Sequence, residues 1–158
     1  MSTLTPGESP IDVQSSYRAI EALIMTYAEL MDHADFAGLG ALLANSAFGG
    51  GAGHVTGSRA IQELFEDMVI VYGDGTPRSK HVTSNVVIEI DELAGSATSR
   101  SYFTVLQALP GVALQPVAAG RYHDRFEAVE GAWRFSERNV LLDLVGDVSR
   151  HLRRPVNT

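Results

Sequence analysis

Cysteine is absent from this sequence of 158 residues. Its absence excludes disulfide bonds, thiolate nucleophiles and metal sites built on thiolates. Long apolar runs are missing as well, since none approaches the roughly 18 residues that a membrane-spanning helix needs. The first ten residues lack the basic start and the apolar centre of a signal peptide. We therefore expect a cytoplasmic protein with no membrane partner.

Positive charge is also scarce. The 12 Lys and Arg residues are outnumbered by 19 Asp and Glu residues, which leaves a formal net charge of −7. This sign disfavours nucleic acids as partners, because their phosphates attract basic surfaces. One basic cluster spans residues 150–154 beside the C-terminus. We interpret this cluster as a solvated tail or a helix-end feature.

Several motifs of catalysis and binding are absent too. The five His residues form no pair with HxH or HxxxH spacing, and no HExxH sequence occurs, so we expect no metal site. No GxSxG motif marks a serine nucleophile. The glycines of residues 48–54 lack the GxGxxG spacing of a phosphate-binding loop, and we interpret them as a flexible connection or a short edge strand. We expect no cofactor.

The length and the ordinary hydrophobic content of 45% fit one globular domain. We assign residues 1–10 to a mobile N-terminal arm, residues 11–148 to the domain and residues 149–158 to a C-terminal tail.

Helical periodicity dominates the first half of the domain. Apolar residues spaced by about one helical turn predict a helix over residues 11–34 and a shorter one over residues 36–43. A third helix is predicted to begin after Ser58, its expected N-cap, and to bury an apolar face that runs from Ile61 to Tyr72.

From Lys80 onward the apolar period changes to two, which predicts strands. We expect them over residues 81–91, 97–108, 115–128 and 132–145. Turn residues punctuate them at Gly95, Pro110-Gly111 and Glu130-Gly131. Helices followed by long antiparallel strands predict an α+β fold with the helices on one face of the sheet.

The hairpin over residues 120–143 carries the strongest local signal. Glu130-Gly131 separates two alternating runs, and the glycine supplies the positive φ that a tight turn needs. Alternation divides the first strand into one face with Arg121, His123 and Arg125 and another with Tyr122, Asp124 and Phe126. We expect the first face to meet solvent or a partner subunit, and Tyr122 and Asp124 to reach a cavity.

Four arginines alternate along the strands, at positions 100, 121, 125 and 138. They either bind an acidic ligand or pair across the sheet with Asp124, Glu127 and Glu137, and the pairing is the favoured interpretation.

Tyr27, Asp32 and His81 are the candidate catalytic residues. A histidine beside a carboxylate and a phenol can act as a general acid or base near neutral pH. The carboxylate sets the tautomer of the imidazole, and the phenol can donate to a developing oxyanion. Asp35 is an alternative carboxylate, because the helical period places it nearer the apolar stripe. Each residue also has a structural interpretation, as a polar strand residue, an exposed acid or a core tyrosine.

The order of these segments resembles the SnoaL-like branch of the nuclear transport factor two-like superfamily. The resemblance rests on a helix ending in YAELMDHAD, the strand KHVTSNVVIEID and the hairpin GRYHDRFEAVEGAWRF, and covers about Tyr17 to Val145. It implies a cone-shaped fold in which a curved antiparallel sheet and three N-terminal helices surround a deep pocket. It also implies a small hydrophobic ligand or substrate, and homodimers or homotrimers formed through the open sheet face.

Some positions match patterns known in this family. Tyr27 and Asp32 match its dehydratase-like pattern, Asp35 matches its dehydrochlorinase-like pattern, and His81 matches the pocket histidine of both. The resemblance implies a cofactor-free dehydratase, isomerase or cyclase acting on an apolar, polyketide-like or steroid-like ring compound. A second pocket histidine and a lysine found in some members have no counterpart, which favours the alternative of a ligand-binding protein or a scaffold subunit. The candidate pocket-lining residues are Phe48, Met68, Tyr72, Phe103, Tyr122 and Trp133.

Overall fold

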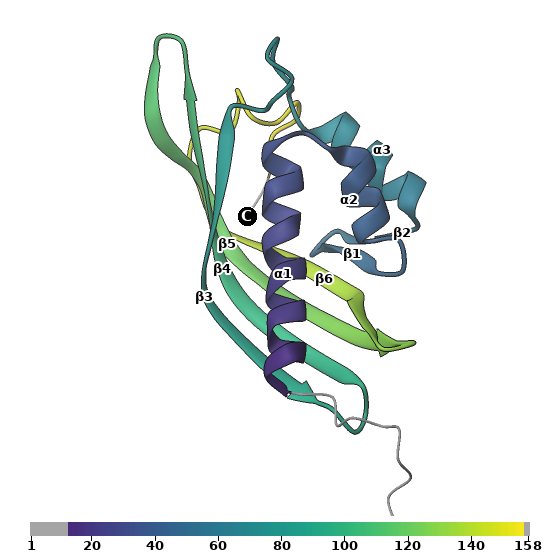
Figure 1. Ribbon diagram of the computed structural model, residues 1–158. Coiled ribbons are helices and arrows are strands. Elements are labelled where there is room, and N and C mark those ends of the chain that lie inside the picture. The colour runs from purple at the N-terminus through teal and green to yellow at the C-terminus, as the bar shows by residue number, and fades with distance from the viewer. Residues whose placement is uncertain (1–12, 157–158) are drawn as a thin grey trace, which may run out of the picture.

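The computed structural model describes residues 13–156, so the expected N-terminal arm lies outside the described residues. Three helices pack on one face of a curved, unclosed sheet of six strands (Figure 1). The helices are α1 (Val13–Asp32), α2 (Phe36–Leu42) and α3 (Ser58–Met68). The strands are β1 (Ala47–Gly50), β2 (Gly53–Thr56), β3 (Ser79–Asp91), β4 (Ser96–Leu109), β5 (Val112–Val129) and β6 (Ala132–Val145). The α+β architecture predicted from the sequence is confirmed.

Helix α1 lies along the concave face of the sheet and buries one stripe of side chains, which includes Ile20, Ile24 and Tyr27. It ends two residues before the predicted end, because Ala34 adopts a positive φ of 54° that interrupts the helical backbone. Asp35 then caps the next helix, since its side chain accepts a hydrogen bond of 2.8 Å from the backbone N–H of Gly38.

The sheet has the strand order β2-β1-β6-β5-β4-β3. Strands β3 to β6 form an antiparallel meander, whereas β1 pairs in parallel with β6, so the sheet is mixed rather than wholly antiparallel. The glycine-rich stretch forms the β1–β2 hairpin at one edge. Glycine is needed there, since a Cβ atom on Gly49 would lie 2.0 Å from the carbonyl oxygen of Gly53.

Two helix-end predictions need correction at α3. Ser58 is the first helical residue, and Gly57 occupies the cap position with φ 91° and no side-chain hydrogen bond. The helix ends at Met68 because Val69 is extended and bridges to Leu152 in the C-terminal segment. Tyr72 therefore lies beyond the helix whose apolar face it was predicted to join.

The β5–β6 hairpin follows the sequence closely. Val129 pairs with Ala132, and the two turn residues Glu130 and Gly131 both have positive φ angles, of 51° and 81°. This confirms the predicted two-residue turn. Tyr122, Asp124 and Phe126 are buried while His123 and Arg125 are exposed, as the alternation predicts.

Within residues 13–156, no helix is long and apolar enough to cross a membrane.

Candidate functional site

A cavity of about 920 Å³ lies between the concave face of the sheet, the end of α1, the end of α3 and the C-terminal segment. Its walls are mostly apolar, with few polar groups, which is typical of sites for small organic ligands. The lining includes aromatic, apolar and imidazole side chains, among them Tyr27, Phe48, Met68, His81, Phe103, Tyr122 and His151.

Asp32 and His81 form a hydrogen-bonded pair at this cavity. Oδ1 of Asp32 accepts one bond of 2.8 Å from the ring Nδ1 of His81 and another of 2.9 Å from the backbone N–H of the same residue. The two side chains are only 10% and 7% exposed. Since a carboxylate can only accept, Nδ1 carries the proton and Nε2 of the neutral ring is the acceptor. The pair thus fixes the tautomer of an imidazole in the cavity wall.

Two tyrosines line the same cavity as His81. The rings of Tyr27 and Tyr122 meet edge to face with centroids 5.7 Å apart, and Phe103 stacks on Tyr122 at 4.6 Å. Burial raises the pKa of Tyr27 to about 12, partly offset by the charge of Arg138, and burial also raises the pKa of Tyr122. Both phenols are therefore protonated at neutral pH. Among the residues that the structure describes, neither hydroxyl has a hydrogen-bond partner, so both can serve a ligand.

Behind the tyrosines lies a fully buried arginine. The guanidinium carbon of Arg138 is 4.0 Å from the ring centre of Tyr27 and 3.8 Å from that of Tyr122. Its Nε lies 3.5 Å from Oδ1 of Asp124, which confirms the predicted pairing across the sheet. Ser99 donates to the other oxygen of this carboxylate at 3.3 Å. Desolvation raises the pKa of Asp124, and the charge of Arg138 opposes that rise.

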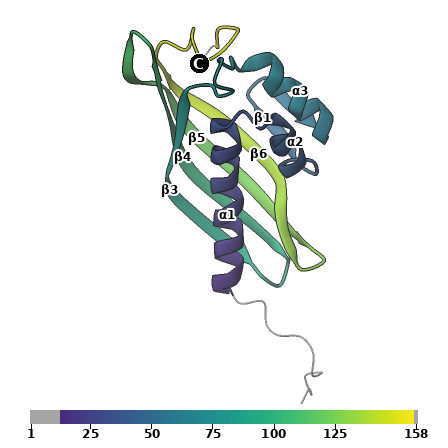
Figure 2. The same cartoon turned by 45° about the horizontal axis from the view of Figure 1, so that its top comes forward.

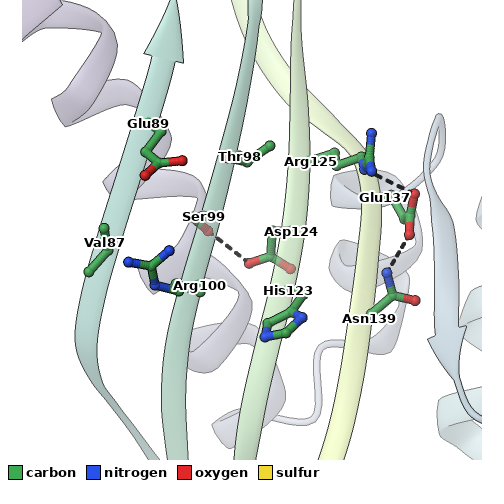
Figure 3. Close-up of a pocket in the computed structure, with 10 residues that line it drawn as sticks. All are labelled: Val87, Glu89, Thr98, Ser99, Arg100, His123, Asp124, Arg125, Glu137 and Asn139. Carbon is green, nitrogen blue, oxygen red and sulfur yellow. Dashed lines mark hydrogen bonds and ion pairs between the residues drawn. The ribbon is translucent and has the colours of Figure 1, made fainter.

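Of the remaining arginine pairs, that of Arg125 lies on the outer face of the sheet. Arg125 pairs with Glu137 as predicted, at 3.7 Å, but Glu127 pairs with Arg134 and not with one of the four arginines singled out in the sequence. Arg121 makes two hydrogen bonds of 2.8 Å to Asp143, and both residues line the cavity, so the expectation that Arg121 meets only solvent or a partner subunit is corrected. Figure 3 shows this outer face, with α1 behind the strands, and a shallow polar hollow of about 350 Å³ that includes Arg100 and His123.

Some candidate residues lie outside the cavity wall. Asp35 caps α2, because the helix breaks at Ala34 and the helical period does not extend to it. Tyr72 donates its hydroxyl to the carbonyl oxygen of Arg150 at 2.5 Å, and Trp133 packs partly buried beside Ala128 at the far end of the last hairpin. Tyr72 and Trp133 are not among the cavity-lining residues, so these two assignments are corrected.

His54 and Asp143 line the cavity although the sequence pattern gave no sign of it, and so does His151. It lies within the cluster interpreted as a solvated tail, and Arg150, Arg153 and Arg154 are indeed exposed, but His151 is only 5% exposed. Burial and the nearby His81 lower its pKa to about 4, although Asp32 acts in the opposite direction. The apolar residues Val148 and Leu152 on either side of it were the available sequence signal, because apolar residues four apart mark the packed face of a helical turn.

No three His, Asp or Glu side chains within residues 13–156 gather closely enough to form a metal site.

Comparison with protein families shows where this architecture belongs. Residues 13–139 match the family model described as the SnoaL-like domain. No curated protein matches the chain.

Solved structures with the same fold share little sequence with this chain. A protein of unknown function from Mycobacterium tuberculosis is 23% identical, with a TM-score of 0.69 over 89% of this chain and 79% of that one. A proposed scytalone dehydratase from Novosphingobium aromaticivorans is 21% identical, with a TM-score of 0.67 over 85% and 89%. A hexachlorocyclohexane dehydrochlorinase of type 2 is 18% identical, with a TM-score of 0.69 over 87% and 92%. At these identities the likeness shows the fold alone.

Proposed function

Because this chain belongs to the SnoaL-like domain family, we propose that it is a cofactor-free enzyme that performs general acid–base chemistry on a small, mostly apolar ring compound. The observation that carries the proposal is the Asp32–His81 pair, held at 2.8 Å in the wall of an apolar cavity of about 920 Å³. The proposed reaction is an elimination, of which dehydration of a ring alcohol beside a ketone is the first choice.

His81 is the residue proposed to move the proton. Its Nε2 takes a proton from the carbon next to the substrate carbonyl, and the electron pair of that C–H bond forms the new double bond as the hydroxyl group leaves. The imidazolium then returns its proton to the departing oxygen, so that water is the second product. Asp32 stabilises the imidazolium and keeps Nδ1 protonated throughout.

The tyrosines supply the polar contact for the carbonyl oxygen. A protonated phenol in a water-poor site can donate a hydrogen bond to the negative charge that develops on that oxygen. Tyr27 is the proposed donor, and Tyr122 is placed to assist it from the facing strand. The raised pKa of Tyr27 supports this role, because the donor stays protonated over the working pH range.

Two of the similar structures carry names that denote eliminations, a dehydratase and a dehydrochlorinase. They support elimination over isomerisation or cyclisation, which the same residues could also perform. The second candidate function is ligand binding without chemistry, which the unpartnered tyrosine hydroxyls in the cavity would equally serve.

The test is a turnover assay with 3-hydroxycyclohexanone and 3-hydroxy-1-tetralone, which lose water to a conjugated enone and to 1-naphthol. We expect both His81→Ala and Asp32→Asn to lower kcat/KM by about 100-fold or more. Asp35→Asn makes the same chemical change three residues away, and since asparagine also caps helices it should change kcat/KM by less than about twofold. Absorbance of the conjugated product measures each rate.

Equal turnover by the wild type, His81→Ala and Asp32→Asn would contradict the proposal. Tight binding of these compounds with no turnover by the wild type would favour the ligand-binding function.

A further inference from the structure

Residues 146–156, the C-terminal segment that follows β6, fold back over the cavity. In Figure 2 this yellow segment lies between the β4–β5 hairpin and α3, at the end of the molecule where α1 finishes. Backbone bonds hold it on both sides: Gly146 N–H donates to Val117 at 2.8 Å, Ile70 N–H to His151 at 2.9 Å, and Arg153 N–H to Met68 at 3.0 Å. The carbonyl of Arg150 also accepts bonds from the side chains of Tyr72 and Gln107. The segment is therefore an ordered part of the cavity wall.

This anchoring places the ring of His151 opposite that of His81. The two ring centroids are 6.3 Å apart and the rings are inclined by 55°. Both residues line the cavity. Ring nitrogens lie about 1 Å from the ring centre, so two nitrogens that face each other across this distance leave room for one oxygen atom about 2.8 Å from both. That oxygen can donate its hydrogen to one imidazole and present a lone pair to the other.

His151 lacks a protein partner of its own. Its Nδ1 is buried without a hydrogen bond, and across residues 13–156 no side chain or backbone group bonds to either ring nitrogen. The Nδ1 atom has almost no surface that a water-sized group can reach, and the ring lines the cavity, so a bound molecule meets this ring at Nε2.

We propose that His151 is a second ligand-binding imidazole, which accepts a hydrogen bond from a hydroxyl group of the bound ring compound and holds that oxygen between itself and His81. This deepens the proposed function and rests on it, since it names a further residue that positions the leaving hydroxyl group. At neutral pH the lowered pKa of His151 keeps its ring uncharged and able to accept.

The role follows from the chemistry of the leaving group. With the hydroxyl hydrogen bound to His151, a lone pair of the oxygen turns toward His81. The C–O bond then breaks as His81 donates its proton to that oxygen, and water leaves. His151 neither gains nor loses a proton, so its part is to orient the oxygen.

The experiment compares two probes that differ by one hydroxyl group, 1-naphthol and naphthalene. Their dissociation constants are measured by fluorescence or calorimetry for the wild type and for His151→Phe. We expect 1-naphthol to bind roughly tenfold more weakly to the variant, as the loss of one hydrogen bond implies. Naphthalene should change by less than about twofold, because phenylalanine preserves the apolar wall.

Two further variants keep the result interpretable. His151→Asn retains a side-chain acceptor and should recover part of the 1-naphthol affinity. Arg153→Ala changes an exposed side chain in the same segment and should bind both probes as the wild type does. Circular dichroism checks that each variant is folded.

Equal losses for the two probes would overturn the proposal, because they would indicate packing alone. An unchanged affinity for 1-naphthol, or no binding of 1-naphthol to the wild type at millimolar concentration, would overturn it as well. Since these measurements need no turnover, a hydroxyl-specific loss in a protein that fails the dehydration assay would refute the proposed reaction and leave this site in place.

Discussion

At the scale of single residues, Arg138 connects the two tyrosines of the cavity wall with the buried Asp124. Its side chain and that of Asp124 are both 0% exposed, and its guanidinium group lies against the rings of Tyr27 and Tyr122. Such a stack orients both phenols through cation–π contact. The charge is thus tolerated because it has a carboxylate on one side and aromatic faces on the other.

Removing this arginine should be costly. Arg138→Ala leaves Asp124 buried without its countercharge, so we expect the free energy of unfolding to fall by about 3–5 kcal/mol. Urea denaturation at neutral pH measures the change. The double variant Arg138→Met with Asp124→Asn should recover much of the loss, since it removes both charges and retains the volume. A double variant no more stable than Arg138→Ala would contradict this explanation.

The second prediction at this scale concerns acid stability. In the unfolded chain the imidazole of His151 takes up a proton near pH 6.5, whereas in the native state its pKa is lowered to about 4. The native state therefore binds fewer protons between these values. Its contribution to stability is complete above pH 6.5 and is lost as the pH falls through 4, by about 3 kcal/mol in total.

The variant His151→Phe isolates this contribution. Urea denaturation from pH 7 to pH 4 should show a smaller loss of unfolding free energy than in the wild type, because phenylalanine has no proton to take up. Parallel pH curves for the two proteins would show that His151 does not titrate in this way.

Among the elements, the turn of the β5–β6 hairpin shows how residue type determines backbone conformation. Glu130 has a φ of 51°, a region that an ordinary side chain enters at a cost, while Gly131 enters it freely. Asparagine tolerates this region better and is favoured at the first position of such a turn.

We therefore expect Glu130→Asn to raise the free energy of unfolding by about 0.5 kcal/mol and Glu130→Val to lower it by about 1 kcal/mol. Thermal and urea denaturation check both changes. Residue 130 does not line the cavity, so ligand affinity serves as the control and should not change in either variant. A stabilising valine would show that the turn does not keep this conformation in solution.

Other elements differ from the sequence prediction where they contact segments that are distant in the chain. The β1–β2 hairpin was ambiguous because its glycines have no apolar period, and its partner β6 lies far along the chain. The end of α3 moved because Val69 bridges to Leu152. In both cases a long-range contact overrode a weak local signal.

For the whole molecule, the outer face of the sheet is the surface to consider. Register aligns Val82, Thr104, Ala119 and Leu144 in one row across four strands. Leu144 is 69% exposed, and Tyr102, two residues along β4 from Thr104, is 53% exposed. Contiguous exposed apolar side chains favour association. We therefore expect a homodimer or homotrimer formed through this face.

Size-exclusion chromatography with light scattering tests the assembly. Tyr102→Glu should convert the oligomer to a monomer, because it places a charge beside this row on the same face of the sheet. Leu93→Glu is the matched control, since Leu93 is fully exposed in the β3–β4 turn and should leave the assembly intact. A wild type that is monomeric at tens of micromolar would contradict the expectation.

The sequence by itself determined what depends on near neighbours. Apolar periods of 3.6 and 2 marked the three helices and the four long strands, and Glu130-Gly131 marked the final turn. Alternation in β5 separated buried Tyr122 and Asp124 from exposed His123 and Arg125. These features follow from local backbone geometry and from which face of an element is apolar, so the residues that carry them lie close together in the chain.

Only the tertiary structure decided which side chains meet. Asp32 and His81 form their hydrogen bond although they are 49 residues apart in the sequence. Asp35 caps α2 and does not face the cavity, because the positive φ of Ala34 interrupts the helical backbone before it. His151 reached the cavity because backbone bonds to Met68 and Ile70 anchor its segment. Such contacts depend on how the sheet curves around α1 and on how residues 146–156 cross the cavity, and the periodicity of one segment contains no information about that path.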